Sequence, residues 1–513
     1  MKPAAPLTQT MGRRKRQGDR FKSINFGRCN PVTSGSSNTA GKDTSTHQAK
    51  FTSGSTMRHV VVMTSAASVG LVSVFFVDAL NLFYISLLGQ QELAAAIGYA
   101  STVLFFAVSI SIGMAIAGSA LVARAYGEDD IDKVRSLSGA SLIYLLVATS
   151  SLAALLYVGR FWCLTLLGAE GETLEKAALF MQIVVPSIPL LGLGMIFGAL
   201  LRSNGDARRA MYVTLGGAIA ALFLDPLFIF GFDLGITGAA IATVATRLIL
   251  VLIGWHGVHV VHKMVSRPDV AHLRAHLRPF LTIALPALAT QLATPVGNAY
   301  VTSAIADFGD DAVAGWAIVG RLIPVAFGVV FALSGSVGPI LAQNFGAGLL
   351  PRVLQAQKDA LKFAFLFCVA VWLLLMLSRD GIIWTFGATG DAAALISTFC
   401  FLVAGSFIFT GAMFVSNAAF NNLGHPLQAT AFNWGRATLG TFPFVYFGKA
   451  WGAEGVLIAW GLGGVIFGVL SSVAAFRMIR RLPDDEGGAN RPGNSPPSTS
   501  NSPFTSGKGA TAG

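Results

Sequence analysis

Apolar runs of 20 residues or more, with few or no charged residues, recur along almost the whole chain. A helix needs about 20 apolar residues to cross the ~30 Å hydrocarbon layer of a bilayer. Only 12% of the 513 residues are charged, about half the share found in a typical soluble domain. The runs do not alternate polar and apolar residues, as the strands of a membrane β-barrel do. The sequence therefore predicts an all-α integral membrane protein.

Twelve of these runs are bounded by glycine, charge or turn residues. They predict transmembrane helices at 59–88, 93–122, 137–161, 177–201, 210–231, 236–258, 280–306, 312–341, 359–379, 391–420, 428–448 and 453–476. The loops on one side hold most of the basic residues, among them Arg135, Arg208 and Arg352. Because basic loops stay in the cytoplasm, both termini are predicted to be cytoplasmic. The chain is thus expected to be a multi-pass protein of the inner (cytoplasmic) membrane, with the lipid bilayer as a partner.

The two ends of the chain differ in composition from the rest. Residues 1–57 form a leader rich in Ser, Thr and Gly, with ten Lys or Arg and two Asp. This composition predicts disorder, and an alternative hypothesis starts translation at Met57. Residues 482–513 form a second disordered tail. The leader carries +8 of the net charge of +11, so the remaining chain is nearly neutral and nucleic acid is not an expected partner.

The second half of the chain repeats the first. "LLGQQELAAAIGYAS" (87–101) recurs as "DFGDDAVAGWAIVGR" (307–321) at an offset of 220, and "LVARAYGEDDIDKVR" (121–135) recurs as "ILAQNFGAGLLPRVL" (340–354) at an offset of 219. Each half holds six spans, so the halves form a parallel repeat about an axis along the membrane normal. The predicted domains are an N-terminal six-helix bundle, a cytoplasmic linker and a C-terminal six-helix bundle, at 58–262, 263–279 and 280–481.

Two acids lie well inside predicted spans, and both belong to the first half. Asp78 stands in "VFFVDALNLF" and Asp225 in "LFLDPLFIFG", whereas the equivalent positions of the second half hold Asn298 and Phe442. An ionised carboxylate at mid-helix costs ~2.5–3.5 kcal/mol even on the mild insertion scale, and such residues usually serve ion pathways. Two alternatives stay open. Asp78 could be a neutral interhelical hydrogen-bond donor, and Asp225 could satisfy backbone groups freed by Pro226.

The chain resembles multidrug and toxic compound extrusion transporters over residues 59–481. No single motif is decisive, but the order and spacing of the motifs are specific to that family. The resemblance is carried by "FVDALNLFYISLLGQQELAAAIG" (76–98), "ALVARAYGEDDIDKVR" (120–135), "ALLRSNGDARRAMYVTLGGAIAALFLDPLFIFGFDLGITGAAIATV" (199–244), "AVAGWAIVGR" (312–321), "GPILAQNFGAG" (338–348) and "NNLGHP" (421–426).

The resemblance implies a two-bundle antiporter that exports small amphipathic organic cations as protons or sodium ions flow inward. It assigns ion coupling to Asp78 and Asp225, with rocking of the two bundles providing alternating access. The chain departs from the family pattern where Ala221 replaces an Asn that often precedes the second acid by four residues. The first span also lacks the proline of many relatives, and the seventh-helix glutamate of one branch falls near Thr294. The sequence thus matches the branch that couples through the N-terminal bundle, and protons are favoured over sodium.

Several other residues are candidates for the substrate cleft. The aromatic side chains of Phe75, Tyr84 and Trp316 could stack on a flat cation, although packing or lipid contact is the alternative for each. The polar candidates are Gln291, Asn298, Asn417 and Asn433. Three arginines lie within spans and are expected to pair with acids or backbone carbonyls, or to line the cleft: Arg247, Arg321 and Arg436.

The sequence offers no sign of a cofactor. There is no GxxxxGK[ST] phosphate loop, so ATP is not expected to drive the protein. The four cysteines lack paired spacing, and the histidines at 256, 259 and 262 are expected to form an interface segment and not a metal site. No nucleophile–base pair stands out, so the chain is not expected to be an enzyme, and a monomer is expected. The competing hypotheses are a flippase for a lipid-linked precursor and a membrane enzyme or scaffold that transports nothing.

Overall fold

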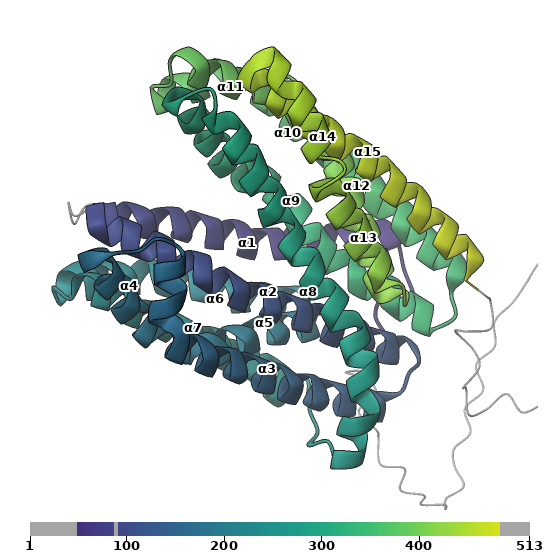
Figure 1. Ribbon diagram of the computed structural model, residues 1–513. Coiled ribbons are helices and arrows are strands. Elements are labelled where there is room, and N and C mark those ends of the chain that lie inside the picture. Colours follow the sequence, from purple (N-terminus) through teal and green to yellow (C-terminus); the bar gives the residue numbers. More distant parts are fainter. Residues whose placement is uncertain (1–48, 87–90, 483–513) are drawn as a thin grey trace, which may run out of the picture. The chain divides into compact units, whose positions relative to one another are not determined.

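The computed structural model describes residues 49–86 and 91–482, apart from the side chains of Asp78 and of several residues beside the gap. All regular structure in these residues is helical (Figure 1), which confirms the predicted all-α class. The first half contains α1 (Thr56–Ser86), α2 (Gln91–Gly127), α3 (Ile131–Leu166), α4 (Gly171–Val184), η1 (Val185–Ser187), α5 (Ile188–Ser203), α6 (Ala207–Pro226), η2 (Leu227–Gly231), α7 (Gly235–Trp255) and η3 (His256–Val261).

The second half continues in the same pattern. It contains α8 (Val270–Ala306), α9 (Asp310–Gly346), α10 (Leu350–Phe386), α11 (Gly390–Phe401), η4 (Val403–Ser406), α12 (Phe407–Asn422), α13 (Pro426–Ala437), α14 (Phe442–Gly448), η5 (Lys449–Trp451) and α15 (Gly452–Arg481). In the described residues, eleven helical stretches are long and apolar enough to cross a membrane. The last of them, Pro426–Arg481, covers two predicted spans. The twelve predicted spans therefore each coincide with one helix or one interrupted helix.

The fourth span is interrupted at equivalent places in the two halves. The turn η1 separates α4 from α5, and η4 separates α11 from α12 in the second half. In η1 the cause is Pro186, which has no backbone N–H to continue the helical ladder. The fifth span of each half is also interrupted, but at different positions. Helix α6 passes into the π-helical turn η2 after Pro226, whereas α13 ends at Ala437 and α14 begins at Phe442. The repeat therefore extends to the interruption of the fourth span.

The two halves touch closely at one end. We call this the basic end, because α3, α6 and α10 begin there and hold Arg135, Arg208 and Arg352 near their starts. Helix α9 packs against both α1 and α2 of the first half. Near the basic end, a Cβ placed on Gly127 would lie 2.1 Å from the carbonyl oxygen of Gln343, so only glycine permits this approach of α2 to α9.

The residues just before α1 are packed at the same end. Although the sequence places residues 49–57 in the disordered leader, Lys50–Ser55 form an ordered turn and α1 begins at Thr56. The ring of Phe51 is only 2% exposed and anchors this segment in an apolar cluster. The predicted linker is likewise shorter than 263–279, because Asp269 caps α8 by accepting a hydrogen bond from Val270 N.

Candidate functional site

Asp225 is buried between two helices of the first half. It lies near the end of α6, is 2% exposed, and precedes Pro226 and the turn η2. The side chain of Asn81 in α1 donates a hydrogen bond to it, with 2.9 Å between Nδ2 and Oδ2. Asp225 is six residues before Gly231, the end of the turn, or roughly 9 Å along a helix. The carboxylate is therefore held well inside the span and shared between α1 and α6.

Close packing of α1 on α6 explains how Asn81 reaches this carboxylate. A Cβ on Gly70 would lie 1.9 Å from Oγ1 of Thr214, so the glycine allows α1 and α6 to approach each other. The side chain of Asp78 lies outside the described part of the structure, but its backbone is helical within α1. Asp78 precedes Asn81 by three residues, and positions three apart share one face of a helix. The two predicted coupling residues thus belong to packed neighbouring helices.

The site residues predicted from the sequence do not include Asn81. Its position could have indicated a role, because it follows Asp78 by three residues in a span with few polar groups. What the sequence alone does not provide is the register of α1 against α6, and this register decides whether the amide reaches Asp225.

The polar candidates of the second half do not gather at one point. Asn433 Nδ2 donates to Asn417 Oδ1 at 2.9 Å, and both side chains are 5% exposed, so these two residues form a buried pair between α12 and α13. Asn298 is exposed and Gln291 is half-buried, both on α8. The structure thus joins two of the four predicted polar residues to each other.

The three aromatic candidates have different surroundings. Trp316 is 9% exposed and its Nε1 donates to Thr302 Oγ1 at 2.9 Å, so it is packed within the second half. Tyr84 lies edge-on to Phe230, with 6.2 Å between ring centroids. The half-buried ring of Phe75 lies beside Gly328 of α9, and so sits where the two halves meet.

Arg247 and Arg436 both bind neutral oxygen atoms. Arg247 is 8% exposed and its Nη1 donates to the carbonyl oxygen of Val184 at 3.2 Å and to Ser187 Oγ at 2.8 Å. It therefore ties α7 to the interruption at η1. Arg436 makes a longer contact of 3.4 Å from Nη2 to Thr294 Oγ1.

Arg321 is exposed on α9. It lies six residues before Phe327, whose backbone is not helical (φ −109°, ψ 15°), so α9 is kinked between Arg321 and Gly328. Gly328, just beyond the kink, is the residue whose Cβ would lie 3.3 Å from Val72 of α1. The exposed Arg321 and the contact with α1 therefore belong to the two different segments of α9.

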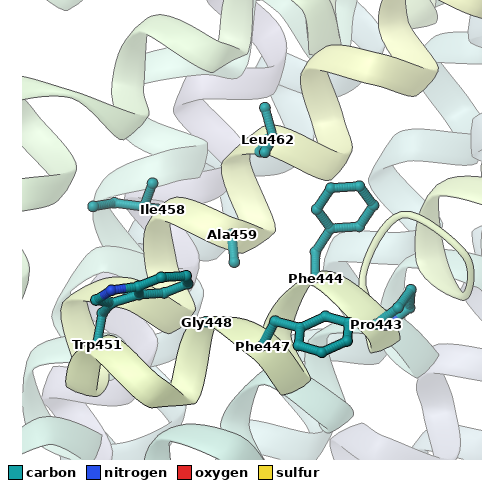
Figure 2. Close-up of a pocket in the computed structure, with 9 residues that line it drawn as sticks. Pro443, Phe444, Phe447, Gly448, Trp451, Ile458, Ala459 and Leu462 are labelled. Atoms are coloured by element: carbon teal, nitrogen blue, oxygen red, sulfur yellow. The ribbon is translucent and has the colours of Figure 1, made fainter.

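An apolar pocket lies elsewhere, between α14 and α15. Its volume is about 390 Å³, and Figure 2 shows the rings of Phe444, Phe447 and Trp451 around it. All nine lining residues are apolar or glycine, and both Phe447 and Trp451 are more than 60% exposed. Such a pocket suits an acyl chain of the surrounding lipid and has no side chain that could bind an ion.

The predicted histidine segment serves packing at the basic end. His262 Nε2 donates to Asp206 Oδ2 at 2.8 Å, and the ring of His259 stacks on Trp255. Asp206 also accepts hydrogen bonds from the backbone N and from Nη1 of Arg209, at 3.1 and 2.6 Å. Burial acts to raise the pKa of Asp206, but the hydrogen bonds from His262 and Arg209 outweigh it and lower the pKa below its usual range. Among the side chains that the structure describes, no three His, Cys, Asp or Glu residues are grouped so that they could hold a metal ion.

A family model matches the chain twice. The MatE model covers residues 66–227 and again residues 286–447, so the two matches are 220 positions apart. The chain belongs to the multidrug and toxic compound extrusion (MATE) family. The double match confirms the repeat that the sequence predicts, and MATE proteins are transporters, not enzymes.

Relatives of this MATE protein differ in the compounds that their names mention. A FAD transporter of Shewanella oneidensis is 29% identical over 422 residues, which is 81% of this chain and 92% of the relative. The probable multidrug resistance protein YpnP of Bacillus subtilis is 26% identical over 441 residues, 84% of this chain and 96% of that protein. The multidrug export protein MepA of Staphylococcus saprophyticus is 25% identical over 52% of this chain and 59% of its own.

Solved MATE structures share the fold. The crystal structure of a mutant of the Vibrio cholerae MATE transporter VcmN has a TM-score of 0.79 at 24% identity and covers 83% of this chain and 97% of that one. An outward-facing MATE structure has a TM-score of 0.80 at 19% identity, covering 86% of this chain and 99% of that one. These likenesses confirm the two-repeat, twelve-helix architecture.

Proposed function

We propose that this MATE protein is an antiporter that exports small organic compounds in exchange for an ion bound in the first half by Asp78 and Asp225. The observation that carries the proposal is the buried carboxylate of Asp225, shared between α1 and α6 inside the membrane-spanning segment. Holding an ionised carboxylate in a membrane is unfavourable, so such residues usually take part in transport. Uptake of a cation neutralises the group, and its release restores the charge.

Protons are favoured as the coupling ion. The resemblance to the branch that couples through the N-terminal bundle favours a proton. Asn81 donates an N–H to the carboxylate of Asp225, and protonation needs only one carboxylate oxygen. Imposing a proton gradient and a sodium gradient separately decides between the two ions.

Transport in proteoliposomes tests the coupling. A pH gradient and a sodium gradient are imposed separately, and efflux of a fluorescent organic cation is measured for the native protein, Asp78→Asn and Asp225→Asn. We expect efflux to follow the pH gradient, to be abolished in Asp78→Asn and to be reduced in Asp225→Asn. Asp310→Asn, which changes an exposed acid in the first turn of α9, is the control. Normal efflux in both variants of the first-half acids would refute the coupling role.

Two substrate classes have support. Export of amphipathic organic cations is favoured by the family and by the multidrug names of several relatives. A flavin nucleotide, which carries a negatively charged pyrophosphate, is the second candidate. It is supported by the FAD transporter of Shewanella and by Arg321, an exposed cation of α9. Guanidinium groups bind phosphate oxygens in a two-pronged geometry.

Separate export assays distinguish these two classes. Ethidium and FAD are each loaded into proteoliposomes, and their export is measured for the native protein and for Arg321→Gln. If a flavin nucleotide is the substrate, FAD export should fall about tenfold in Arg321→Gln, whereas ethidium export should not fall. The control is Arg379→Gln, which removes a cation paired with Asp380 in another part of the second half. Export of ethidium alone by the native protein would exclude the flavin candidate.

A further inference from the structure

Asn81 has a part in ion coupling that goes beyond a general packing contact. We infer that Asn81 is a positioning residue that holds the carboxylate of Asp225 across the α1–α6 interface. The inference rests on the proposed role of Asp225 in coupling. Its geometric basis is the 2.9 Å hydrogen bond from Asn81 Nδ2 to Asp225 Oδ2, which joins two helices at positions 144 residues apart in sequence.

The composition of α6 shows why the amide comes from a different helix. Residue 221 lies four positions before Asp225, one turn away on the same helix face, and it is an alanine without a hydrogen-bonding side chain. A buried carboxylate needs hydrogen-bond donors to offset the loss of water. Asn81 supplies such a donor from α1 and is itself half-buried. The hydrogen bond from Asn81 therefore ties the position of the Asp225 carboxylate to the register of α1.

This arrangement also links the two predicted coupling residues. Asn81 follows Asp78 by three positions in α1 and bonds to Asp225 in α6. A shift of α1 by one residue would move the amide by about 1.5 Å along the helix axis, which is enough to lengthen a hydrogen bond beyond its normal range. Any movement of α1 against α6 during transport thus changes the hydrogen bond to the Asp225 carboxylate.

A rescue experiment tests this role. We compare proton-driven efflux and melting temperature for Asn81→Ala, Ala221→Asn and the double variant Asn81→Ala/Ala221→Asn. Loss of one hydrogen bond in a membrane interior should lower the efflux rate of Asn81→Ala about tenfold, without lowering the melting temperature by more than a few degrees. The double variant places an amide one helical turn from Asp225 and should recover most of the rate. Asp310→Asn, which changes an exposed acid in the first turn of α9, is the control and should transport normally.

The possible outcomes separate this inference from the proposed function. Efflux that is lost in Asp225→Asn but normal in Asn81→Ala overturns only the positioning role. A rate that stays low in the double variant, although that variant is folded and Ala221→Asn alone is active, also overturns it. Normal efflux in both Asp78→Asn and Asp225→Asn refutes the proposed function itself.

A second observation concerns residues 49–55, which we call the strap. We propose that the strap is a latch that stabilises the state in which the two halves meet at the basic end. Its backbone is bound by the second half at several points. Phe51 N donates to Gln343 Oε1 at 3.0 Å, and Asn344 Nδ2 donates to Phe51 O at 3.1 Å. Arg352 donates to the carbonyl oxygens of Phe51, Ser53 and Gly54 at 3.0 to 3.2 Å.

The strap contacts the first half as well. A Cβ on Gly205, in the turn between α5 and α6, would lie 3.1 Å from Lys50 and 3.2 Å from the ring of Phe51. Gln343 completes the connection, because its Nε2 donates to Ser203 O at 2.7 Å while its Oε1 accepts from Phe51. One glutamine of α9 therefore binds the end of α5 and the strap together. Separation of the halves at this end requires these bonds to break.

Thiol labelling in nanodiscs tests the latch. Ser336 of α9 is fully buried and its Oγ donates to Met63 O of α1, so Ser336→Cys in a cysteine-free background reports opening between the halves. We expect Phe51→Ala and Arg352→Ala each to speed labelling of that cysteine by a maleimide at least several-fold. The control is Arg477→Ala, near the end of α15. Unchanged labelling in a folded Arg352→Ala protein would overturn the latch, since this variant removes strap contacts without creating an apolar cavity.

Discussion

Gly127 and Gly346 occupy equivalent positions of the two halves, and each lies against the other's helix. A Cβ on Gly127 would be 2.1 Å from the carbonyl oxygen of Gln343, and a Cβ on Gly346 would be 2.2 Å from that of Arg124. The two positions are 219 apart in sequence, as are Arg124 and Gln343. The contact between α2 and α9 is therefore symmetric under the repeat, and both copies of the motif keep the glycine that it needs.

Substituting either glycine should separate the halves at the basic end. Alanine in a helix is ordinarily more stable than glycine by roughly 0.5–1 kcal/mol. Gly127→Ala and Gly346→Ala should instead lower the melting temperature by several degrees, because the new methyl group meets a backbone carbonyl. Gly98→Ala in α2 and Gly320→Ala in α9 are matched controls, since a Cβ at these positions meets nothing within 4 Å. A melting temperature that rises in all four variants would contradict the close contact.

Arg247 should matter for stability, and Arg321 should not. Arg247→Leu removes two hydrogen bonds, to the carbonyl of Val184 and to the hydroxyl of Ser187, at a cost of about 1–3 kcal/mol. Arg247→Lys should restore only part of this stability, because an ammonium group cannot reproduce the planar guanidinium. Arg321→Gln should leave the melting temperature in detergent unchanged, since its side chain is exposed. Equal destabilisation by Arg247→Leu and Arg321→Gln would contradict the different surroundings of the two arginines.

Asn417 and Asn433 should behave as a structural pair. Asn433→Ala leaves the buried Oδ1 of Asn417 without this donor, at a cost of about 1–3 kcal/mol. In Asn417→Ala the amide of Asn433 keeps its hydrogen bond to the carbonyl oxygen of Ala429, so the cost should be smaller. The double variant Asn417→Ala/Asn433→Ala should be less destabilised than the sum of the single variants, because the two residues interact. Chemical unfolding or melting in detergent measures the four proteins of this cycle. Strictly additive effects would show that the hydrogen bond contributes nothing.

The Asp206 cluster predicts a pH dependence of stability. Because the pKa of Asp206 is lowered in the folded protein, its contribution is complete above the unfolded value of about 3.9 and is lost as the pH falls through the folded value. Asp206→Asn should thus lower the melting temperature at pH 7 and pH 5 alike, and its difference from the native protein should shrink only near pH 4 and below. A difference that disappears between pH 7 and pH 5 would contradict this assignment.

The sequence predicts the spans well because the bilayer imposes a length and an apolar composition on each of them. The repeat is also visible in the sequence, since matched segments such as 121–135 and 340–354 keep their order and spacing. The buried acid Asp225 can be found for the same reason, because a carboxylate is rare inside a span. Each of these features can be recognised in the sequence without knowing how the helices pack.

Contacts between helices were harder to predict. Whether Asn81 reaches Asp225 depends on how α1 packs on α6 at Gly70 and Thr214. Asn417 and Asn433 are expected in the cleft as separate residues, but they bind each other because α12 and α13 pack together there. The strap was missed for another reason. Its composition matches that of the leader, and Phe51 alone gives no sign that a pocket for its ring exists on distant helices.

The packed strap has a practical consequence for how the protein is produced. An expression clone that begins at Met57, or a fusion tag joined there, omits Phe51 and Thr56, the latter of which donates a hydrogen bond to Asp359 of α10. Such a protein would retain every hydrophobic span and insert in the bilayer, yet Arg352 and Gln343 would have lost their strap partners. If the strap acts as a latch, assays on that shortened protein would report a transporter in which the state with the halves in contact at the basic end is less populated. Purification tags are therefore better attached at the other terminus.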